Sequence, residues 1–183
     1  MGVYNSEQKK MTFVKMKAKT SDTDLTPIFG IFEKVGNAWV IGKVCNALSG
    51  ELTGIEHKTY TYEGEEKNSC KMTFADPDGS VTVVESGFNN MFYNVLNALA
   101  HNHEGTVSIE LYLGKPDANN KQYPRAAVRL NGEKTDWKYK DDSIPRAKIQ
   151  KVTIGKGKTK DVKDDTEVVD FWKQVIENIS AEL

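Results

Sequence analysis

The sequence contains little cysteine and no long apolar run, and both shortages exclude classes of protein. Its two cysteines, Cys45 and Cys70, cannot form a disulfide framework, so we expect buried thiols. The mean hydropathy is −0.55, and no apolar run approaches the roughly 18 residues that suggest a membrane span. Residues 1–7 include no apolar stretch, so we expect no secretory signal. With 38% hydrophobic and 28% charged residues, the 183-residue chain is expected to form one soluble globular domain, with or without tails.

The chain also lacks a substantial net charge, which at first argues against a nucleic-acid partner. It has 25 Lys and Arg against 26 Asp and Glu, a formal net charge of −1. The charges are unevenly spread, because residues 161–183 hold seven acids and two bases, a net of −5, whereas residues 1–160 have a net of +4. This split indicates that residues 1–160 bind an anionic partner and that the C-terminal segment binds another partner. The alternative is a solvated acidic helix face.

No catalytic or metal-binding motif is present. Residues 157–159 (Gly-Lys-Thr) resemble the end of a phosphate loop, but Val152 occupies the position that needs the first glycine. His101, His103 and Glu104 have no further ligand at a suitable spacing, so we expect a solvated helix end there. An enzyme would need an acid–base or metal cluster. We therefore expect a protein that is not an enzyme, with no catalytic residues, no metal and no cofactor.

The hydrophobic pattern predicts a mostly β chain with one or two helices. Lysines alternating with apolar residues at 14–19 are typical of an edge strand. Further strands are predicted near residues 39–45, 48–61, 69–75, 81–85, 107–113, 126–130 and 148–154. One helix is predicted after an N-cap at Asn89 or Asn90, with the apolar face Phe92, Val95, Leu96 and Leu99. A second helix is predicted from the stripe Val168, Trp172, Val175, Ile176 and Ile179. Trp39, Phe74 and Trp137 are expected in the core, and Trp137 would instead be at the surface if it lies at the mouth of the barrel.

The central order of three strands, a helix and two strands matches the five-stranded Greek-key barrel called the OB-fold. Gly50 and Gly54 lie inside its long first strand and indicate a bend or bulge. We therefore expect an N-terminal extension packing on the barrel over residues 1–38, and an OB-fold domain that binds single-stranded nucleic acid over residues 39–160. Residues 161–183 are expected to be an acidic C-terminal helical segment. Its apolar stripe would pack on the barrel or form an oligomer contact.

Aromatic and basic residues occupy the presumed outward-facing strand positions and one loop. Single-stranded nucleic acid needs this mixture, because bases stack on aromatic rings for about 1–3 kcal/mol each while Lys and Arg contact phosphates. The alternative is that tyrosine is simply favoured in strands. The predicted stacking residues are Tyr60, Tyr62, Tyr112 and Tyr123. The predicted phosphate contacts are Lys58, Lys71, Lys115, Lys121, Arg125 and Arg129.

The spacing of several motifs between residues 39 and 180 resembles that of OB-fold single-stranded DNA-binding proteins encoded by tailed bacteriophages. These motifs are the runs 50–64 and 72–80, Ser86-Gly87 before the helix with residues 96–99, the strand 109–113, Asn131-Gly132, residues 137–139 and Phe171-Trp172. The chain departs from the family in ending with an apolar-faced helix, whereas family tails are often short, disordered and strongly acidic.

The resemblance implies a protein that coats single-stranded DNA without strong sequence preference during phage DNA replication, recombination or repair, in the host cytoplasm. It also implies that the acidic C-terminal segment contacts replication or recombination proteins and competes with DNA for a basic groove; no membrane partner is expected. The alternative is a phage structural or assembly protein that uses a small barrel as a protein-interaction module. That alternative predicts an exposed apolar helix at 167–179 and stable oligomers without DNA.

Overall fold

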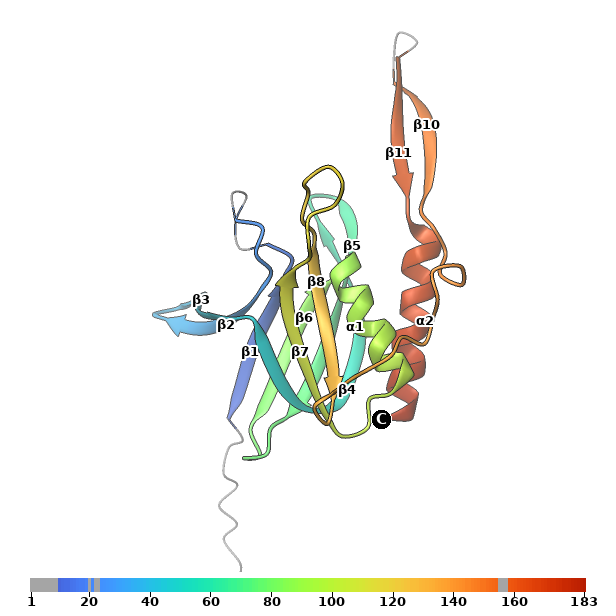
Figure 1. Ribbon diagram of the computed structural model, residues 1–183. Helices are drawn as coiled ribbons and strands as arrows, with labels where there is room; N and C mark the ends of the chain where they lie inside the picture. Colours follow the sequence, from blue (N-terminus) through green and yellow to red (C-terminus); the bar gives the residue numbers. More distant parts are fainter. Residues whose placement is uncertain (1–9, 20, 22–23, 155–157) are drawn as a thin grey trace, which may run out of the picture.

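The computed structural model describes residues 10–19, 21, 24–154 and 158–183, which form mainly β structure with two helices (Figure 1). The strands that form the main sheet are β1 (Met11–Lys17), β2 (Ile28–Val35), β3 (Ala38–Cys45), β4 (Ala47–Tyr62), β5 (Glu65–Ala75), β6 (Val81–Gly87), β7 (Thr106–Leu113), β8 (Pro124–Leu130) and β9 (Glu133–Lys134). The remaining elements are α1 (Asn90–His101), β10 (Lys148–Ile154), β11 (Lys158–Asp164) and α2 (Thr166–Glu182). The prediction of a mostly β chain is confirmed.

The main sheet is an open sheet with the strand order β3-β2-β1-β6-β5-β4-β7-β8-β9. The expectation of a closed five-stranded barrel is therefore wrong. Closing the five strands β6-β5-β4-β7-β8 would require β6 to pair with β8, but β1 occupies that edge of β6 in a parallel pairing. The sheet is nevertheless curled, and β2 also approaches β4 and β7 (Figure 1).

Strand β1 lies inside the sheet, so the prediction of an edge strand is wrong. It pairs antiparallel with β2 on one side and parallel with β6 on the other. Val14 and Met16 are buried while Lys15 is exposed, so the alternation in the sequence reports a buried and a solvated face rather than an edge. The N-terminal segment thus contributes strands to the sheet, and the expected boundary between residues 38 and 39 falls inside β3.

The long strand β4 bends as the sequence predicted. Its first residues pair with β7 along one edge, and its remainder pairs with β5 along the other. The pairing with β5 shifts register between Leu52 and Gly54, which is a β-bulge. At Gly50, a side-chain Cβ would lie 3.0 Å from the Cβ of Phe74, so glycine permits this close approach of strands. The bend lets β4 border both halves of the curled sheet.

The helices fill and cover the concave side of the sheet. The side chain of Asn89 caps α1 by accepting a 3.0 Å hydrogen bond from the backbone N–H of Phe92, and the predicted face of α1 is fully buried. Helix α2 packs against β4 and α1 through Trp172, Val175, Ile176 and Ile179. The apolar stripe of the acidic segment is therefore part of the core, and the expectation that this stripe packs on the body is confirmed.

Near the end of α1, His103 differs from the expected solvated helix end. It is buried, and its Nδ1 lies 3.0 Å from the carbonyl oxygen of Leu99, while its Nε2 lies 3.9 Å from a carboxylate oxygen of Glu182 at the end of α2. The histidine thus joins the ends of the two helices. His101 and Glu104 are exposed, as expected.

Strands β10 and β11 form a separate antiparallel ribbon that extends away from the body (Figure 1). Its side chains are mostly exposed, including Ile149 at 72%. In the part of the chain that the structure describes, the ribbon pairs with no other strand. The expected boundary between residues 160 and 161 falls inside β11. The sequence Gly155-Lys156-Gly157-Lys158 predicts a flexible basic loop, of which residues 155–157 lie outside the described residues.

Candidate nucleic-acid interface

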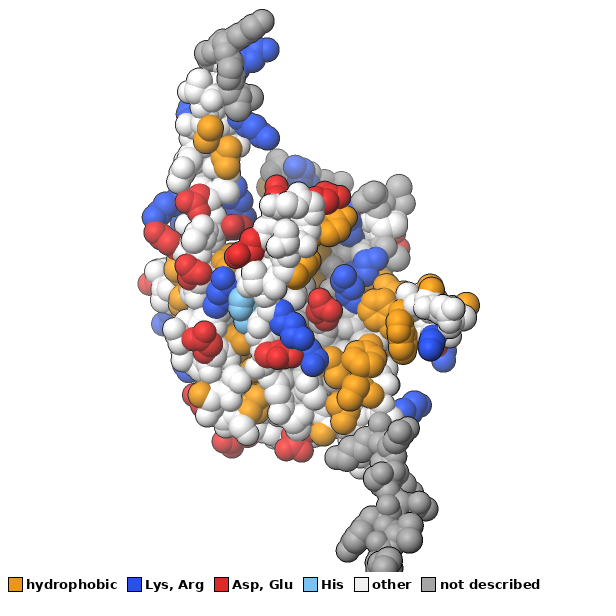
Figure 2. All heavy atoms as spheres, turned by 180° about the vertical axis from the view of Figure 1, so that it is seen from behind, with side chains coloured by type: hydrophobic (Ala, Val, Ile, Leu, Met, Phe, Trp, Pro, Cys, Tyr) orange, Lys and Arg blue, Asp and Glu red, His pale blue; other side chains and the backbone are white. Residues whose placement is uncertain are grey.

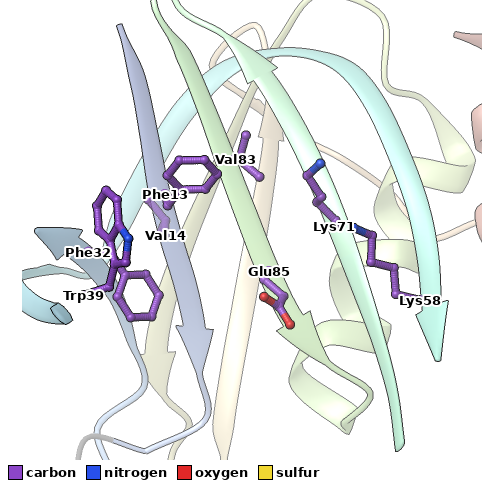
Figure 3. A pocket seen from close by; sticks show the side chains of 8 residues that line it. All are labelled: Phe13, Val14, Phe32, Trp39, Lys58, Lys71, Val83 and Glu85. Carbon is purple, nitrogen blue, oxygen red and sulfur yellow. The ribbon is translucent and has the colours of Figure 1, made fainter. Parts of the chain in front are cut away.

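A groove runs across the convex side of the sheet, and we call it the outer-face groove. It has a volume of about 530 Å³. Figure 3 shows its aromatic side chains at one side, its two lysines at the other, and two side chains of β6 between them. The lining residues are Phe13, Val14, Phe32, Trp39, Lys58, Lys71, Val83 and Glu85.

The aromatic side of this groove comes from β1 and the β2–β3 hairpin. Phe13 and Trp39 meet edge to face, with ring centroids 6.1 Å apart. Trp39 is 58% exposed, so the expectation that it belongs to the core is wrong, whereas Phe74 is buried as expected. The β2–β3 hairpin, which carries Trp39, projects sideways from the sheet (Figure 1). Figure 2 shows hydrophobic side chains gathered on this side of the molecule.

The basic side of the groove is formed by Lys58 on β4 and Lys71 on β5. Both ammonium groups approach the same carboxylate oxygen of Glu56, Lys58 at 3.4 Å and Lys71 at 3.2 Å. The hydrogen bond from Lys71, helped by the charge of Lys58, holds the pKa of Glu56 below its usual range. Glu85 adds a second carboxylate to the lining. The groove therefore carries cations that are locally neutralised.

Two predicted tyrosines extend the groove along β4. Lys58, Tyr60 and Tyr62 occupy every second position of β4 and therefore share one face of the strand. Successive side chains on this face lie roughly 6.6 Å apart. The two rings are half exposed, at 47% and 58%. The structure thus brings four of the ten predicted site residues, Lys58, Tyr60, Tyr62 and Lys71, to one face of neighbouring strands.

The other six predicted residues lie on β7, β8 and the loop between them. Tyr112 and Arg125 are cross-strand partners, and Arg129 lies further along β8. Tyr112 and both arginines are exposed, as are Lys115, Lys121 and Tyr123 in the loop. Among the described residues, the structure shows no hydrogen bond or ion pair between these six and the first four. The predicted residues therefore form two groups rather than one site.

Asp117 holds the β7–β8 loop in shape. Its Oδ1 accepts backbone hydrogen bonds from Asn119 and Lys121, at 2.8 and 2.9 Å, and its Oδ2 accepts one from the Tyr123 hydroxyl at 3.3 Å. The hydrogen bond from the Lys121 backbone contributes most to lowering the pKa of the Asp117 carboxyl, and those from Asn119 and Tyr123 lower it further. Lys121 and Tyr123 are thus positioned by one ionised side chain.

A second groove, the α1 groove, lies between α1, the start of β8, the segment 137–147 and the base of the ribbon, with a volume of about 690 Å³. Tyr123 and Arg125 from the second predicted group line it. Three further basic or aromatic residues of this groove, Trp137, Arg146 and Lys163, are not among the predicted site residues. Trp137 is 49% exposed, so its expected place in the core is also wrong.

The β4–β5 hairpin lies between the two grooves. Lys58 lines the outer-face groove, whereas its neighbour His57 points to the opposite face of β4 and contacts Phe88, with ring centroids 5.6 Å apart. Phe88 in turn lines the α1 groove.

The described residues include no cluster of three or more His, Cys, Asp or Glu that could hold a metal ion. None of the described helices has the length and apolar character needed to cross a membrane. Comparison of the chain with protein-family models, with curated proteins and with solved structures finds no match.

Proposed function

We propose that this protein binds single-stranded DNA without strong sequence preference and coats it during phage DNA replication, recombination or repair. The observation that carries the proposal is the outer-face groove, where Phe13, Phe32 and Trp39 lie opposite Lys58 and Lys71. Stacking is tolerant of sequence because every base has a π face, and lysines follow the phosphates. Tyr60 and Tyr62 offer two further stacking surfaces next to this groove.

The topology supports a partly open OB-fold as the platform. Strands β6, β5, β4, β7 and β8 are consecutive neighbours, and α1 connects β6 to β7. OB-folds are partly open five-stranded Greek-key barrels that bind oligonucleotides on a strand face and adjoining loops. In this proposal, β1 to β3 widen the platform and add the aromatic side of the outer-face groove.

The acidic segment has a different role from a free tail in this proposal. Its acids near the ribbon are engaged locally, since Glu167 pairs with Lys148 and Asp165 lies 3.7 Å from Lys163. Glu177, further along α2, is exposed. Replication or recombination proteins are therefore proposed partners of the outward side of α2, rather than of a segment that swings into a groove.

A fluorescence titration with oligo-dT at low and high salt tests the proposed function. Trp39 and Trp137 are exposed and line the two grooves, so base stacking is expected to quench their emission. We expect micromolar or tighter binding that weakens with salt, because phosphate contacts release counterions. Absence of binding at low salt would overturn the proposal.

A second candidate, an assembly protein, is favoured by one observation. The edge strand β3 exposes Val40, Ile41 and Val44, and an apolar edge is a template for pairing with another chain. Its other expected support is missing, because the apolar stripe of α2 is buried. Light scattering with and without oligo-dT separates the candidates, since only the assembly protein forms stable oligomers without DNA.

A further inference from the structure

The positive charge of the chain is concentrated in the β10–β11 ribbon. Residues 146–163 hold seven of the 25 Lys and Arg and one acid, Asp161. Residues 1–145, by contrast, hold 17 bases and 19 acids. The basic excess of residues 1–160 therefore comes from the ribbon segment and not from the sheet.

The ribbon presents lysines on both of its faces. The register pairs Val152 with Lys160 and Lys151 with Asp161, so Lys160 and Lys151 lie on opposite faces. Seven residues per strand give a length of roughly 23 Å. The ribbon contains no aromatic residue, so it offers cations without a stacking surface.

The lysines differ in whether acids already neutralise them. At the base, Lys148 pairs with Glu167 and Lys163 with Asp165. Further out, Lys151, Lys158 and Lys160 are exposed and form no ion pair with any described residue. They contrast with Lys58 and Lys71 in the outer-face groove, which share Glu56. The outer ribbon therefore holds cations ready for a polyanion.

The ribbon also continues from a groove that has stacking groups. Arg146 and Lys163 at its base line the α1 groove together with Tyr123 and Trp137. Figure 1 shows the ribbon pointing to the same side of the molecule as the end of the β4–β5 hairpin and the β7–β8 loop. The body does not need this ribbon for its sheet, and two strands alone are marginally stable in water. Binding of a ligand, rather than stabilisation of the fold, therefore explains why the ribbon is rich in lysine.

We propose that the β10–β11 ribbon is an arm that binds the phosphate backbone of nucleic acid and supplies most of the salt-dependent part of the affinity. This inference rests on the proposed function, because it takes the grooves as the site of base stacking. The phosphates can belong to the same single strand or to an adjoining duplex, since a two-stranded ribbon also fits the major groove. The substrates below distinguish these sources.

The test compares the full chain with the triple variant Lys151→Gln, Lys158→Gln, Lys160→Gln. A matched control, Lys10→Gln, Lys134→Gln, Lys140→Gln, makes the same charge change at exposed positions outside the ribbon and both grooves. Each protein is titrated at several salt concentrations with oligo-dT and with the same oligo-dT attached to a hairpin duplex. Thermal unfolding checks that all three proteins remain folded, as expected for exposed side chains.

The slope of log K against log salt is expected to become shallower by about 2 in the ribbon variant, at about 0.7 per lost phosphate contact, and to change little in the control. A shallower slope on both DNAs assigns the phosphate contacts of the arm to the single strand. A shallower slope on the hairpin DNA alone assigns them to the duplex. Equal slopes in the ribbon variant and the control would overturn the inference while the proposed function stands. Failure of the unmodified chain to bind oligo-dT would instead overturn the proposed function.

Discussion

The ammonium group of Lys71 lies 3.2 Å from Oε1 of Glu56, and the same oxygen also lies 3.4 Å from the ammonium group of Lys58. One carboxylate thus holds the two lysines of the outer-face groove in place and neutralises part of their charge. The Glu56 carboxylate orders the two lysines for a ligand, but it also competes with the ligand's phosphates for their ammonium groups. The balance between these effects can be measured.

Replacing Glu56 with Gln is expected to tighten binding of oligo-dT. The substitution removes the charge that competes with phosphate, so at low salt the affinity should rise several-fold and the salt slope should steepen by up to about 1.4, at about 0.7 for each freed lysine. The measurement is the fluorescence titration at several salt concentrations. Glu51→Gln, an exposed change on the same strand outside the groove, is the control. Unchanged or weaker binding would show that ordering of the lysines matters more than their neutralisation.

Replacing Trp39 with Ala is expected to weaken oligo-dT binding at least about fivefold, because one stacked base contributes about 1–3 kcal/mol. Trp39→Phe should retain most of the affinity but lose part of the fluorescence quenching. The control is Val35→Ala, which truncates another exposed apolar side chain of the β2–β3 hairpin that does not line the groove. Equal affinities for Trp39→Ala and Val35→Ala would exclude Trp39 as a stacking surface.

The local patterns of the sequence predicted much of the fold but not how the sheet is completed. Alternation and helical spacing report which residues face inward, and they predicted β4, α1 and the buried stripe of α2. The parallel pairing of Met11–Met16 with Val81–Ser86 joins distant segments. No local pattern specifies such a pairing, because alternation tells how a strand faces and not which strand lies beside it.

The candidate site was predicted in part for the same reason. Alternation places Lys58, Tyr60 and Tyr62 on one face of a strand, and the structure confirms this shared face. The sequence favours a core position for Trp39, because large aromatic residues usually bury much of their surface. Its exposure depends on the hairpin projecting beyond the sheet, which is a tertiary feature. Phe13 could have been found, since it alternates with the buried Val14 and Met16 and must therefore face outward.

Replacing Trp172 with Ala is expected to destabilise the fold by about 3–5 kcal/mol, the usual effect of truncating a buried large aromatic. Trp172 is 2% exposed and stacks on Tyr93, with ring centroids 5.1 Å apart and planes 8° from parallel. Trp172→Phe should cost less, because it keeps a ring and removes an indole N–H that has no hydrogen-bond partner among the described residues. Urea unfolding measures both changes, with the exposed Leu183→Ala as control. A loss below about 1 kcal/mol for Trp172→Ala would contradict the placement of α2 in the core.

The stability of the fold is expected to fall as the pH rises through about 8.5, the pH at which an ordinary thiol is half ionised. Burial raises the pKa of the Cys70 thiol, so the unfolded chain loses this proton at a lower pH than the folded chain does. Alkali therefore stabilises the unfolded state, and stability declines. Burial also raises the pKa of Tyr93 to about 12, which extends the decline above pH 10.

Urea unfolding of Cys70→Ala between pH 7 and 10 tests this dependence. Relative to its own value at pH 7, the variant should lose less stability than the unmodified chain, because it has no buried thiol to keep protonated. Tyr93→Phe should differ from the unmodified chain only at the upper end of the range. An identical decline in Cys70→Ala would assign the pH dependence to other groups.

Replacing Asn97 with Ala is expected to destabilise the fold by about 1–3 kcal/mol, because it leaves backbone groups of Tyr139 without partners. Asn97 is buried in α1, and its amide donates to the carbonyl oxygen of Tyr139 at 2.9 Å and accepts from the Tyr139 N–H at 2.8 Å. This pair fixes the segment after β9 against α1. Asn94→Ala, one turn earlier on α1 at a half-buried position, is the matched control and should change stability by less than about 0.5 kcal/mol. Equal urea midpoints for the two variants would show that the segment is held by Phe171, whose ring meets that of Tyr139 at 5.1 Å, rather than by the amide.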